Sequence, residues 1–478
     1  MRTRYIVSAA LLVLASASVA GAQQKAAAPA KPAWEQQWEL GFRSTTTTGD
    51  EARYMRYEDL KSGLASKIAI GKESDAVAYD FSAANVGYDD QSFAFSYNRY
   101  GKAKFNVNFN GQPLNYGFNT LTPFRDAGNN KWTLDPTLRT RVQNKEAGVI
   151  GIGTTGAQYN SASIYRSIAT EFPMSAQRNT LDLGLKYMVN KYAAVDFSYK
   201  MVQKSGNQPW GAAFAFNNAT EIPMTLDNGV NEITAGIEFA KSEYGMIRAE
   251  YQGSFFKQNL ATMEWDSPLR ATDFDNGKTP PNGPWDASGY SNGNGPAFGR
   301  MSMAPSSALN ALNVTALYKM PNHTTLNGSF SLVRMTQDDD IIPWTTNTKI
   351  AQAATYAFFP GLSSLRRPTA EGQVDALNAV INFTTRPTNY FAFDMKYRFN
   401  DHNNQTPHWN GEYNVRFDAV PEYVPGSESE PLDVRQSTVE TGATFTLPNR
   451  STSLRFGYIL DDVKRSGRAF SDMTDYTF

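Results

Sequence analysis

The stretch TLDLGLKYMVNKYAAVDFSYKM, residues 180–201, indicates the fold class, because its apolar residues recur at every second position. Leu181, Leu183 and Leu185 lie on one side of this alternation. Asp182 and Lys186 lie on the other side. A period of two is the period of a β-strand. The stretch therefore predicts two strands, each with one apolar and one charged face, joined by a turn at 189–191.

The same alternation recurs along the rest of the chain. A strand is predicted at 36–42 and several more within 54–110. Strand pairs are predicted within 180–203, 231–256, 310–335, 377–400 and 438–461, and the final segment, 471–478, alternates poorly. Strands of about ten residues can cross a bilayer when they are tilted. The count comes to roughly 16, and side chains cannot fill the interior of so wide a barrel.

The connections between these strands fall into two classes. One class is short and contains Pro and Asn, which favour tight turns, at 189–191, 241–243, 321–323, 387–389 and 448–450. The other class is long and polar, at 111–178, 203–230, 258–308, 336–375 and 401–437. This asymmetry is typical of outer-membrane barrels. We therefore predict an all-β fold, a transmembrane antiparallel β-barrel of at least about 16 strands with short periplasmic turns and long extracellular loops.

A soluble β-sandwich or propeller is the alternative, since such proteins also alternate and contain hairpins. Tyrosines at the predicted strand ends favour the membrane barrel, because aromatic residues gather at membrane interfaces; they are Tyr187, Tyr192, Tyr244, Tyr318, Tyr390 and Tyr458. Burial of the charged face in a dry core would cost free energy of desolvation, whereas a hydrated or occupied lumen accommodates such charges. The charges expected to face the lumen are Asp182, Lys186, Asp196, Lys200, Arg248, Glu250, Asp394, Lys396 and Arg398.

The start of the chain predicts export. Arg2 and Arg4 precede an apolar run at 6–20, and Ala20-Gly21-Ala22 matches an A-x-A cleavage site. We read residues 1–22 as a signal peptide of the Sec pathway and place the mature protein in a Gram-negative outer membrane. The Ala- and Pro-rich segment 23–33 is a predicted flexible lead-in, and 34–478 is the predicted barrel.

The composition excludes several classes of function. The formal net charge is −1, which does not favour nucleic acid as a partner. The chain contains no Cys, so it cannot attach haem c, hold an iron–sulfur cluster or use a Cys nucleophile. The three histidines are His323 in a predicted turn and His402 and His408 in one predicted polar loop, where solvated side chains are expected. We predict no catalytic site, no metal site and no cofactor of the chain's own.

Four segments carry a resemblance to a known family. They are 38–42 (WELGF), 53–63, 85–93 (NVGYDDQSF) and 461–466 (DDVKRS), the last directly after a strand that contains Phe456-Gly457-Tyr458. In these segments the chain resembles the MtrB/PioB-type decahaem-associated outer-membrane β-barrels. The rest of the chain resembles them mainly in its hairpin rhythm.

The resemblance implies a function for the barrel and a partner. The barrel would be a sheath around a periplasmic multihaem c-type cytochrome and would support electron transfer across the outer membrane. The haem c would belong to that partner, and an extracellular multihaem cytochrome would be a further partner at the long loops. In this interpretation the lumen charges meet the cytochrome. A general or substrate-specific diffusion porin, in which the same charges line a hydrated lumen, remains the alternative.

Overall fold

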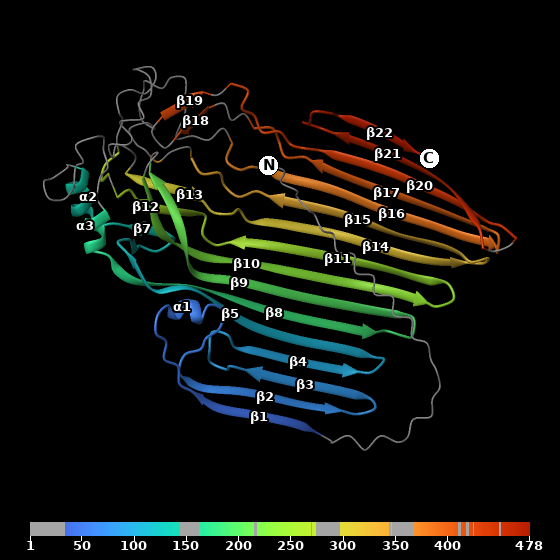
Figure 1. Ribbon diagram of the computed structural model, residues 1–478, viewed down its shortest axis with the longest axis horizontal. Coiled ribbons are helices and arrows are strands. Elements are labelled where there is room, and N and C mark those ends of the chain that lie inside the picture. Colours follow the sequence, from blue (N-terminus) through green and yellow to red (C-terminus); the bar gives the residue numbers. More distant parts are fainter. Residues whose placement is uncertain are drawn as a thin grey trace.

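A computed structural model gives the architecture of the chain (Figure 1). It describes residues 34–143, 162–214, 218–268, 270–273, 297–343, 346, 367–409, 413–416, 420–423, 425–448 and 451–478. The predicted signal peptide, 1–22, and the predicted lead-in, 23–33, lie outside the described residues.

Within the described residues, a single antiparallel sheet of 16 strands dominates the fold (Figure 1). Each strand pairs with its neighbours along the chain, and β1 and β22 are the two edges. In order, the strands are β1 (Glu35–Arg43), β2 (Gly63–Glu73), β3 (Val77–Ala84), β4 (Ser92–Arg99), β5 (Ala103–Thr122), β8 (Thr170–Met188), β9 (Ala193–Phe214), β10 (Asn218–Lys241), β11 (Gly245–Gln258), β14 (Ser307–Met320), β15 (Thr324–Gln337), β16 (Gly372–Thr388), β17 (Phe391–Asn404), β20 (Val434–Thr446), β21 (Ser453–Arg465) and β22 (Asp472–Thr477).

The predicted hairpins and the asymmetry of their connections are confirmed. All five predicted strand pairs form as antiparallel neighbours, and the short connections share one end of the sheet, which we call the short-turn end. At the β14–β15 turn, Asn322 and His323 adopt the left-handed φ values of 60° and 53° that such a tight turn requires. The opposite end, which we call the long-loop end, carries the connection from β5 to β8 and that from β11 to β14.

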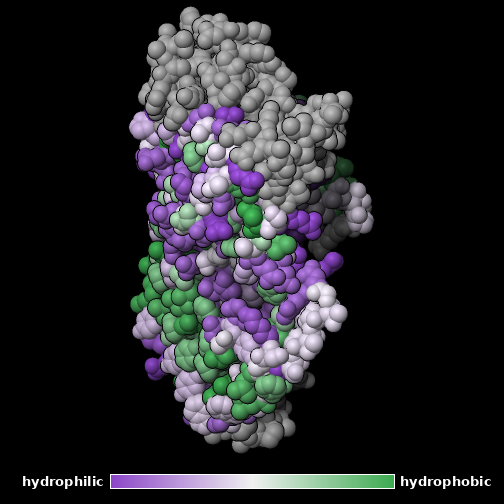
Figure 2. Space-filling model, turned by 90° about the vertical axis from the view of Figure 1, so that its left-hand side faces the viewer, coloured by the Kyte–Doolittle hydropathy of each residue, from purple (hydrophilic) through white to green (hydrophobic). Residues whose placement is uncertain are grey.

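The sheet has two chemically different faces. The apolar face carries Leu185, Phe197 and Ile237, which alternate with polar residues along each strand. By strand register Leu185 lies opposite Phe197, and Ile237 lies opposite Val195 on the same face. Ile237 is 58% exposed, and many other large apolar side chains are exposed with it. Figure 2, viewed from the long-loop end, shows hydrophobic side chains gathered along one edge of the molecule and toward the bottom. Such exposure would be costly in water and suits a lipid-facing wall.

The predicted long loop 203–230 is wrong, because β9 and β10 continue through most of it. The two strands remain paired until Phe214 opposite Asn218. The apolar residues change face in this region, because Ile222 and Met224 lie on the face that carries Glu232, and Pro209 and Pro223 suggest a break. The two prolines lie directly opposite each other, so the two backbone N–H groups that proline lacks are missing at one position of the β9–β10 pairing. Burial of Ile222 and Met224 beneath a separate layer stabilises the extension.

That layer, which we call the cap, is built from segments within the connections at the long-loop end (Figure 1). Its sheet has the order β13-β12-β7-β6. Its elements are β6 (Arg125–Asp126), β7 (Lys131–Thr133), α2 (Pro136–Gln143), α3 (Ala162–Ser167), β12 (Thr262–Asp266) and β13 (Phe298–Ser302). Further short elements are α1 (Glu51–Tyr54), β18 (Tyr413–Arg416) and β19 (Val420–Tyr423). Among the described residues, no helix is long and apolar enough to cross a membrane.

The cap contains a hydrophobic core of its own. Trp132, Met263 and Ile222 are completely buried in one cluster, and the ring of Trp132 meets Phe172 edge-on at 5.5 Å. By register, Phe172 and Ile222 belong to the face of the sheet that also carries Asp182 and Lys186. The cap therefore packs on the polar face, at the long-loop ends of β8 to β10.

Candidate functional site

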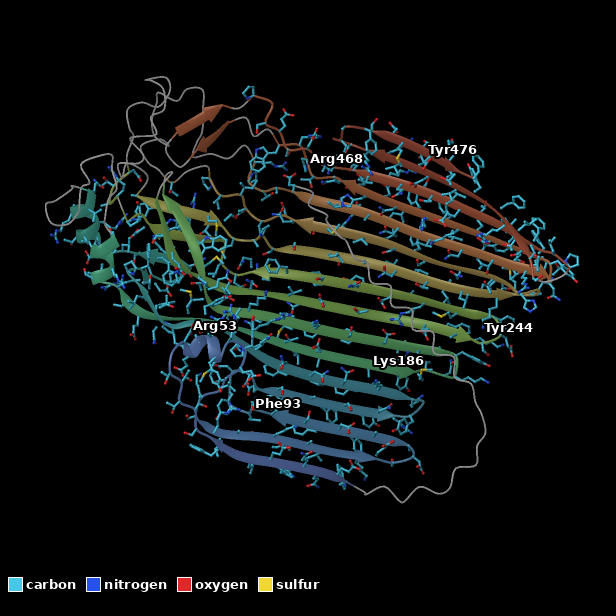
Figure 3. All side chains as sticks on the ribbon, in the orientation of Figure 1. Arg53, Phe93, Lys186, Tyr244, Arg468 and Tyr476 are labelled. Carbon is cyan, nitrogen blue, oxygen red and sulfur yellow. The ribbon has the colours of Figure 1, made fainter. Side chains whose placement is uncertain are left out.

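The nine charged residues predicted to face the lumen lie on one face of the sheet. Strand register pairs Lys186 with Asp196, Asp182 with Lys200, and Lys396 with Glu440 across neighbouring strands. The same register, followed from β9 to β17, places the other members on this polar face. Each of the nine also lies within about seven residues of the short-turn end of its strand. They form a charged zone in the half of the polar face that the cap does not cover, and Figure 3 shows Lys186 near the short-turn end.

An arginine-centred cluster is the most developed part of this zone. Arg248 on β11 donates two hydrogen bonds to Asp196 on β9, with Nη1–Oδ1 and Nη2–Oδ2 distances of 2.5 Å and 2.8 Å. Its Nη2 also donates to Glu250 at 2.5 Å, and Glu238 lies 3.9 Å away. Asp196 and Arg248 are each about a quarter exposed. A bidentate guanidinium–carboxylate pair at this depth is held in one geometry.

The bridge from β9 to β11 passes over β10, and a glycine makes that possible. Gly236 of β10 lies directly between Asp196 and Glu250 in the register. A Cβ at this position would lie 2.6 Å from Arg248 Nη2 and 2.9 Å from Asp196 Oδ1. Any larger residue would displace the guanidinium. Gly236 is therefore part of the cluster although it carries no side chain.

The same arrangement occurs a second time in the later strands. Arg455 on β21 donates two hydrogen bonds to Asp394 on β17, at 2.6 Å and 2.8 Å. It passes over Gly442 of β20, which pairs with Asp394 in the register. A Cβ on Gly442 would collide with the guanidinium of Arg455. Both bridges start three residues or fewer from the short-turn end of their strands, so they lie at the same level of the sheet.

A hollow adjoins the second bridge on the polar face. It has a volume of about 420 Å³ and is lined by Asp394, Lys396, Glu440 and Arg455, among others. Arg398 forms an ion pair with Glu440 beside it. A second hollow, of about 520 Å³, lies over β1 to β5 and includes Ala69, Asp80 and Ser96 among its lining residues. Small and charged side chains thus leave room next to the polar face.

Sequence reasoning missed several members of the charged zone. Arg455, Glu238 and Glu440 belong to it. Arg455 and Glu238 each stand between two apolar residues of a strand, which is a signal the sequence contains, whereas Glu440 has one apolar neighbour, Val439. Gly236 and Gly442 offered no such signal, because their role depends on which strand lies beside them.

A buried charge holds the cap together at the long-loop end. Arg139 of α2 lies 3.3 Å from Asp266 of β12, and both side chains are more than nine-tenths buried. Arg139 also donates hydrogen bonds to the backbone carbonyls of Ser267 and Ala297. Burial lowers the pKa of Arg139, and the nearby carboxylate of Asp266 opposes that shift. Burial also disfavours the charged form of the Tyr165 phenol and so raises its pKa, and its hydroxyl donates a hydrogen bond to the backbone carbonyl of Pro268.

Three of the four segments that carry the family resemblance meet at the long-loop ends of β1 to β4, and the fourth, 461–466, lies at the long-loop end of β21. Asp59 is buried and accepts a hydrogen bond from the backbone N–H of Asp89. The guanidinium of Arg43 lies 6.0 Å from the ring centre of Tyr88. A Cβ on Gly63 would collide with the Tyr88 hydroxyl, so a glycine is needed there. These motif residues therefore contact one another and stabilise the loops.

The histidines lie in three different environments. His323 is in the β14–β15 turn, and His408 Nδ1 lies 3.1 Å from the carbonyl oxygen of Ser429. The assignment of His402 to a loop is wrong, because β17 continues to Asn404 and His402 pairs with Ala376 and Val434. Among the described residues, no group of three or more His, Asp or Glu side chains is arranged to hold a metal ion.

Comparison with known proteins identifies relatives of the chain. A family model described as an outer membrane beta-barrel porin, MtrB/PioB, matches residues 47–478. No curated protein matches the chain. Similar solved structures include a loop L8 deletion mutant of OmpT from Vibrio cholerae, with 8% identity, coverage of 93% of this chain and 97% of that chain, and a TM-score of 0.26. The closed form of the ferric-catecholate import receptor Fiu from Escherichia coli K12 has 10% identity and a TM-score of 0.34, and the match covers 86% of this chain and 63% of that chain.

Proposed function

Because this chain belongs to the MtrB/PioB family of outer-membrane β-barrel porins, we propose that it encloses a periplasmic multihaem c-type cytochrome and supports electron transfer across the outer membrane. The 16-stranded sheet is the wall of a transmembrane antiparallel β-barrel in the outer membrane, with its apolar face toward lipid. Its polar face then lines the lumen.

The position of the charged zone is the observation that carries the proposal. The nine predicted lumen charges lie near the short turns, which are periplasmic in outer-membrane barrels. A partner that enters from the periplasm meets this zone first. The cap packs on the lumen face at the other end, where it would interfere with free diffusion of solutes. This division of the lumen favours an enclosed partner over an open pore.

The chemistry of the chain assigns the redox centres to the partner. Attachment of haem c needs cysteine thiols, and the chain has none. Haem c would supply the electron transfer from within the cytochrome. The barrel's own residues would bind that protein, hold it in line across the membrane and shield it from lipid.

The lumen residues divide into two roles in this proposal. Arg248 and Arg455 are each bound by an aspartate, so they stiffen the wall and are not free to change partners. Lys186, Lys200 and Lys396 lie near them on the polar face and have flexible stems that can reach a partner. We expect these lysines to contact acidic groups of the cytochrome and to contribute both to its binding and to its orientation.

Co-purification from outer membranes tests the proposal directly. Lys200→Gln removes a charge from the charged zone, whereas Lys204→Gln removes one on the same face of β9, four residues nearer the cap. We expect Lys200→Gln to lower the haem recovered with the barrel and Lys204→Gln to leave it near the wild-type level. Heat-modifiable migration on gels would confirm that both variants fold.

Single-channel conductance distinguishes the proposal from the porin alternative. We expect the purified barrel to lose conductance when the periplasmic multihaem cytochrome is added, since the cytochrome would occupy the lumen. Deletion of the barrel should reduce the amount of that cytochrome in the membrane, because each stabilises the other by mass action. A large current that the cytochrome does not block, with no haem recovered, would support a diffusion porin instead.

A further inference from the structure

The rim of the sheet at the short-turn end is strongly basic. Between 72–77, 99–103, 188–193, 241–245, 319–324 and 386–391, the structure shows seven basic and three acidic side chains. The basic residues are Lys72, Arg99, Lys102, Lys191, Lys241, Lys319 and Arg386, and the acidic residues are Glu73, Asp75 and Glu243. The whole chain has a net charge of −1, so this rim concentrates positive charge well above the average.

Aromatic rings accompany these cations at four positions around the rim. Lys102 Nζ lies 4.6 Å from the ring centre of Tyr187, and Lys241 Nζ lies 4.6 Å from that of Tyr244. Lys72 Nζ lies 5.0 Å from Trp34, and Lys191 Nζ lies 4.8 Å from Tyr192. Trp34 and Tyr244 are 51% and 56% exposed. Figure 3 shows Tyr244 at this end of the sheet.

These rings mark the margin of the apolar face. Tyr187 lies next to Val195 in the register, on the same face as Leu185 and Phe197, which are 44% and 43% exposed. Amphipathic rings at such a margin sit at the level of lipid headgroups. A lysine beside each ring therefore places its ammonium group at the depth of the lipid phosphates.

We propose that this basic rim binds the phosphate groups of anionic phospholipids in the periplasmic leaflet of the outer membrane. The ammonium and guanidinium groups would hold the phosphates, and the acyl chains would lie along the apolar face. Short turns are periplasmic in outer-membrane barrels, so the rim meets the phospholipid leaflet. Positive charge next to an anionic lipid surface is attractive, and the attraction is screened by salt.

Some of the lysines also stabilise neighbouring turns. Lys102 Nζ donates to the carbonyl of Met188, and Lys319 Nζ donates to that of Ser242. An ammonium group has three donors, so one bond to a carbonyl leaves others for a phosphate. The test therefore avoids these two lysines and uses Lys72, Lys191 and Lys241. Lys241 Nζ also lies 3.5 Å from Glu243 Oε2, but this pair is exposed and solvent weakens it.

Lipid binding to the purified, folded barrel tests the proposal. The rim variant combines Lys72→Gln, Lys191→Gln and Lys241→Gln. The matched control combines Lys257→Gln, Arg435→Gln and Lys464→Gln, which neutralise three cations of the apolar face at the long-loop end. Each protein in detergent micelles is titrated with phosphatidylglycerol or with phosphatidylethanolamine, and bound lipid is counted by native mass spectrometry.

We expect the wild type and the control to retain phosphatidylglycerol over phosphatidylethanolamine. The rim variant should lose at least about tenfold in apparent affinity for phosphatidylglycerol, since each cation near an anionic lipid contributes roughly a fivefold factor before screening. Added salt should weaken wild-type binding toward that of the variant. Equal retention by the rim variant and the wild type would overturn the proposal. So would a rim variant that keeps its lipid but loses an acidic periplasmic protein from pull-downs.

Discussion

Substitution of the glycine beneath Arg248 measures what the strand-crossing bridge contributes to stability. Gly236→Ala places a Cβ within 2.6 Å of Arg248 Nη2, so the guanidinium has to leave Asp196. The clash involves the end of a flexible side chain, and the backbone can stay in place. The variant therefore removes the bridge while it preserves every charged residue.

Two opposing contributions determine how Gly236→Ala changes the free energy of unfolding. Alanine favours a strand interior over glycine by about 0.5–1 kcal/mol. A bidentate pair that is about a quarter exposed should be worth about 1–2 kcal/mol, between the small value of surface pairs and the cost of breaking buried ones. Gly236→Ala should then destabilise the folded barrel by about 0.5–1 kcal/mol. The Asp394–Arg455 pair is 41% and 56% exposed and worth less, so Gly442→Ala should be close to neutral.

Gly457→Ala is the matched control. Gly457 pairs with Gly442 on the same polar face, and the nearest atom to its added Cβ is 3.8 Å away. This variant should gain the full strand preference of about 0.5–1 kcal/mol. The assay is urea unfolding of the barrel in lipid vesicles, followed by heat-modifiable migration on gels. In an Asp196→Ala background, where the bridge is already absent, Gly236→Ala should also become stabilising. If Gly236→Ala stabilises the wild-type barrel as much as Gly457→Ala does, the bridge contributes nothing and the reasoning is refuted.

Four further predictions concern other parts of the molecule. Met395→Arg places a charge in the middle of the apolar face of β17 and should destabilise the folded barrel by about 2–4 kcal/mol. Lys396→Arg on the polar face should be tolerated. Equal yields of folded barrel from the two variants would contradict the assigned register. Because the chain has no Cys, single cysteine substitutions can report its topology. On intact cells an impermeant maleimide should label Ser44→Cys in the β1–β2 loop and should not label Ser242→Cys in the β10–β11 turn. The reverse pattern would show that the barrel has the opposite orientation in the membrane. Burial raises the pKa of the Asp90 carboxyl above its usual value. The ionised carboxylate therefore destabilises the folded protein, and this cost is absent below the usual Asp pKa and complete above the raised pKa. Asp90→Asn should raise the midpoint of unfolding at neutral pH and leave it unchanged in acid. Arg139→Gln leaves Asp266 buried without its cation, so proteolysis of the cap at the cell surface should increase while the strand ladder stays heat-modifiable, and an unchanged cleavage rate would argue against the ion pair as the anchor of the cap.

The wall of the barrel could be predicted from the sequence because its signal is local. Within a strand such as β8, a period of two assigns Leu183 and Asp182 to opposite faces without knowledge of the neighbouring strands. Tight turns such as 321–323 then pair consecutive strands. The charged zone followed from the same alternation, and Arg455 between Leu454 and Phe456 could have been added on that basis.

The cap and the glycines could not be predicted in this way, because their roles arise from contacts between distant segments. Trp132 and Met263 share one core although 130 residues separate them, and the alternating stretches that contain them are too short to show which segment each one packs against. The polar segment 203–208 reads as a loop because neither face of that strand is apolar. Gly236 becomes informative only when Asp196 and Arg248 are known to flank it.

The sequential order of the wall has a consequence for biogenesis. Every strand pairs with the strand before it, so each hairpin can close as soon as its second strand is available, with little loss of chain entropy. The cap cannot form in the same manner, since Asn130 contacts Met303, which lies 173 residues further along the chain. The wall can therefore form hairpin by hairpin, whereas the core of the cap can form only when β13 and the residues after it are in place. The surface end of the protein should be the last part to acquire its native structure.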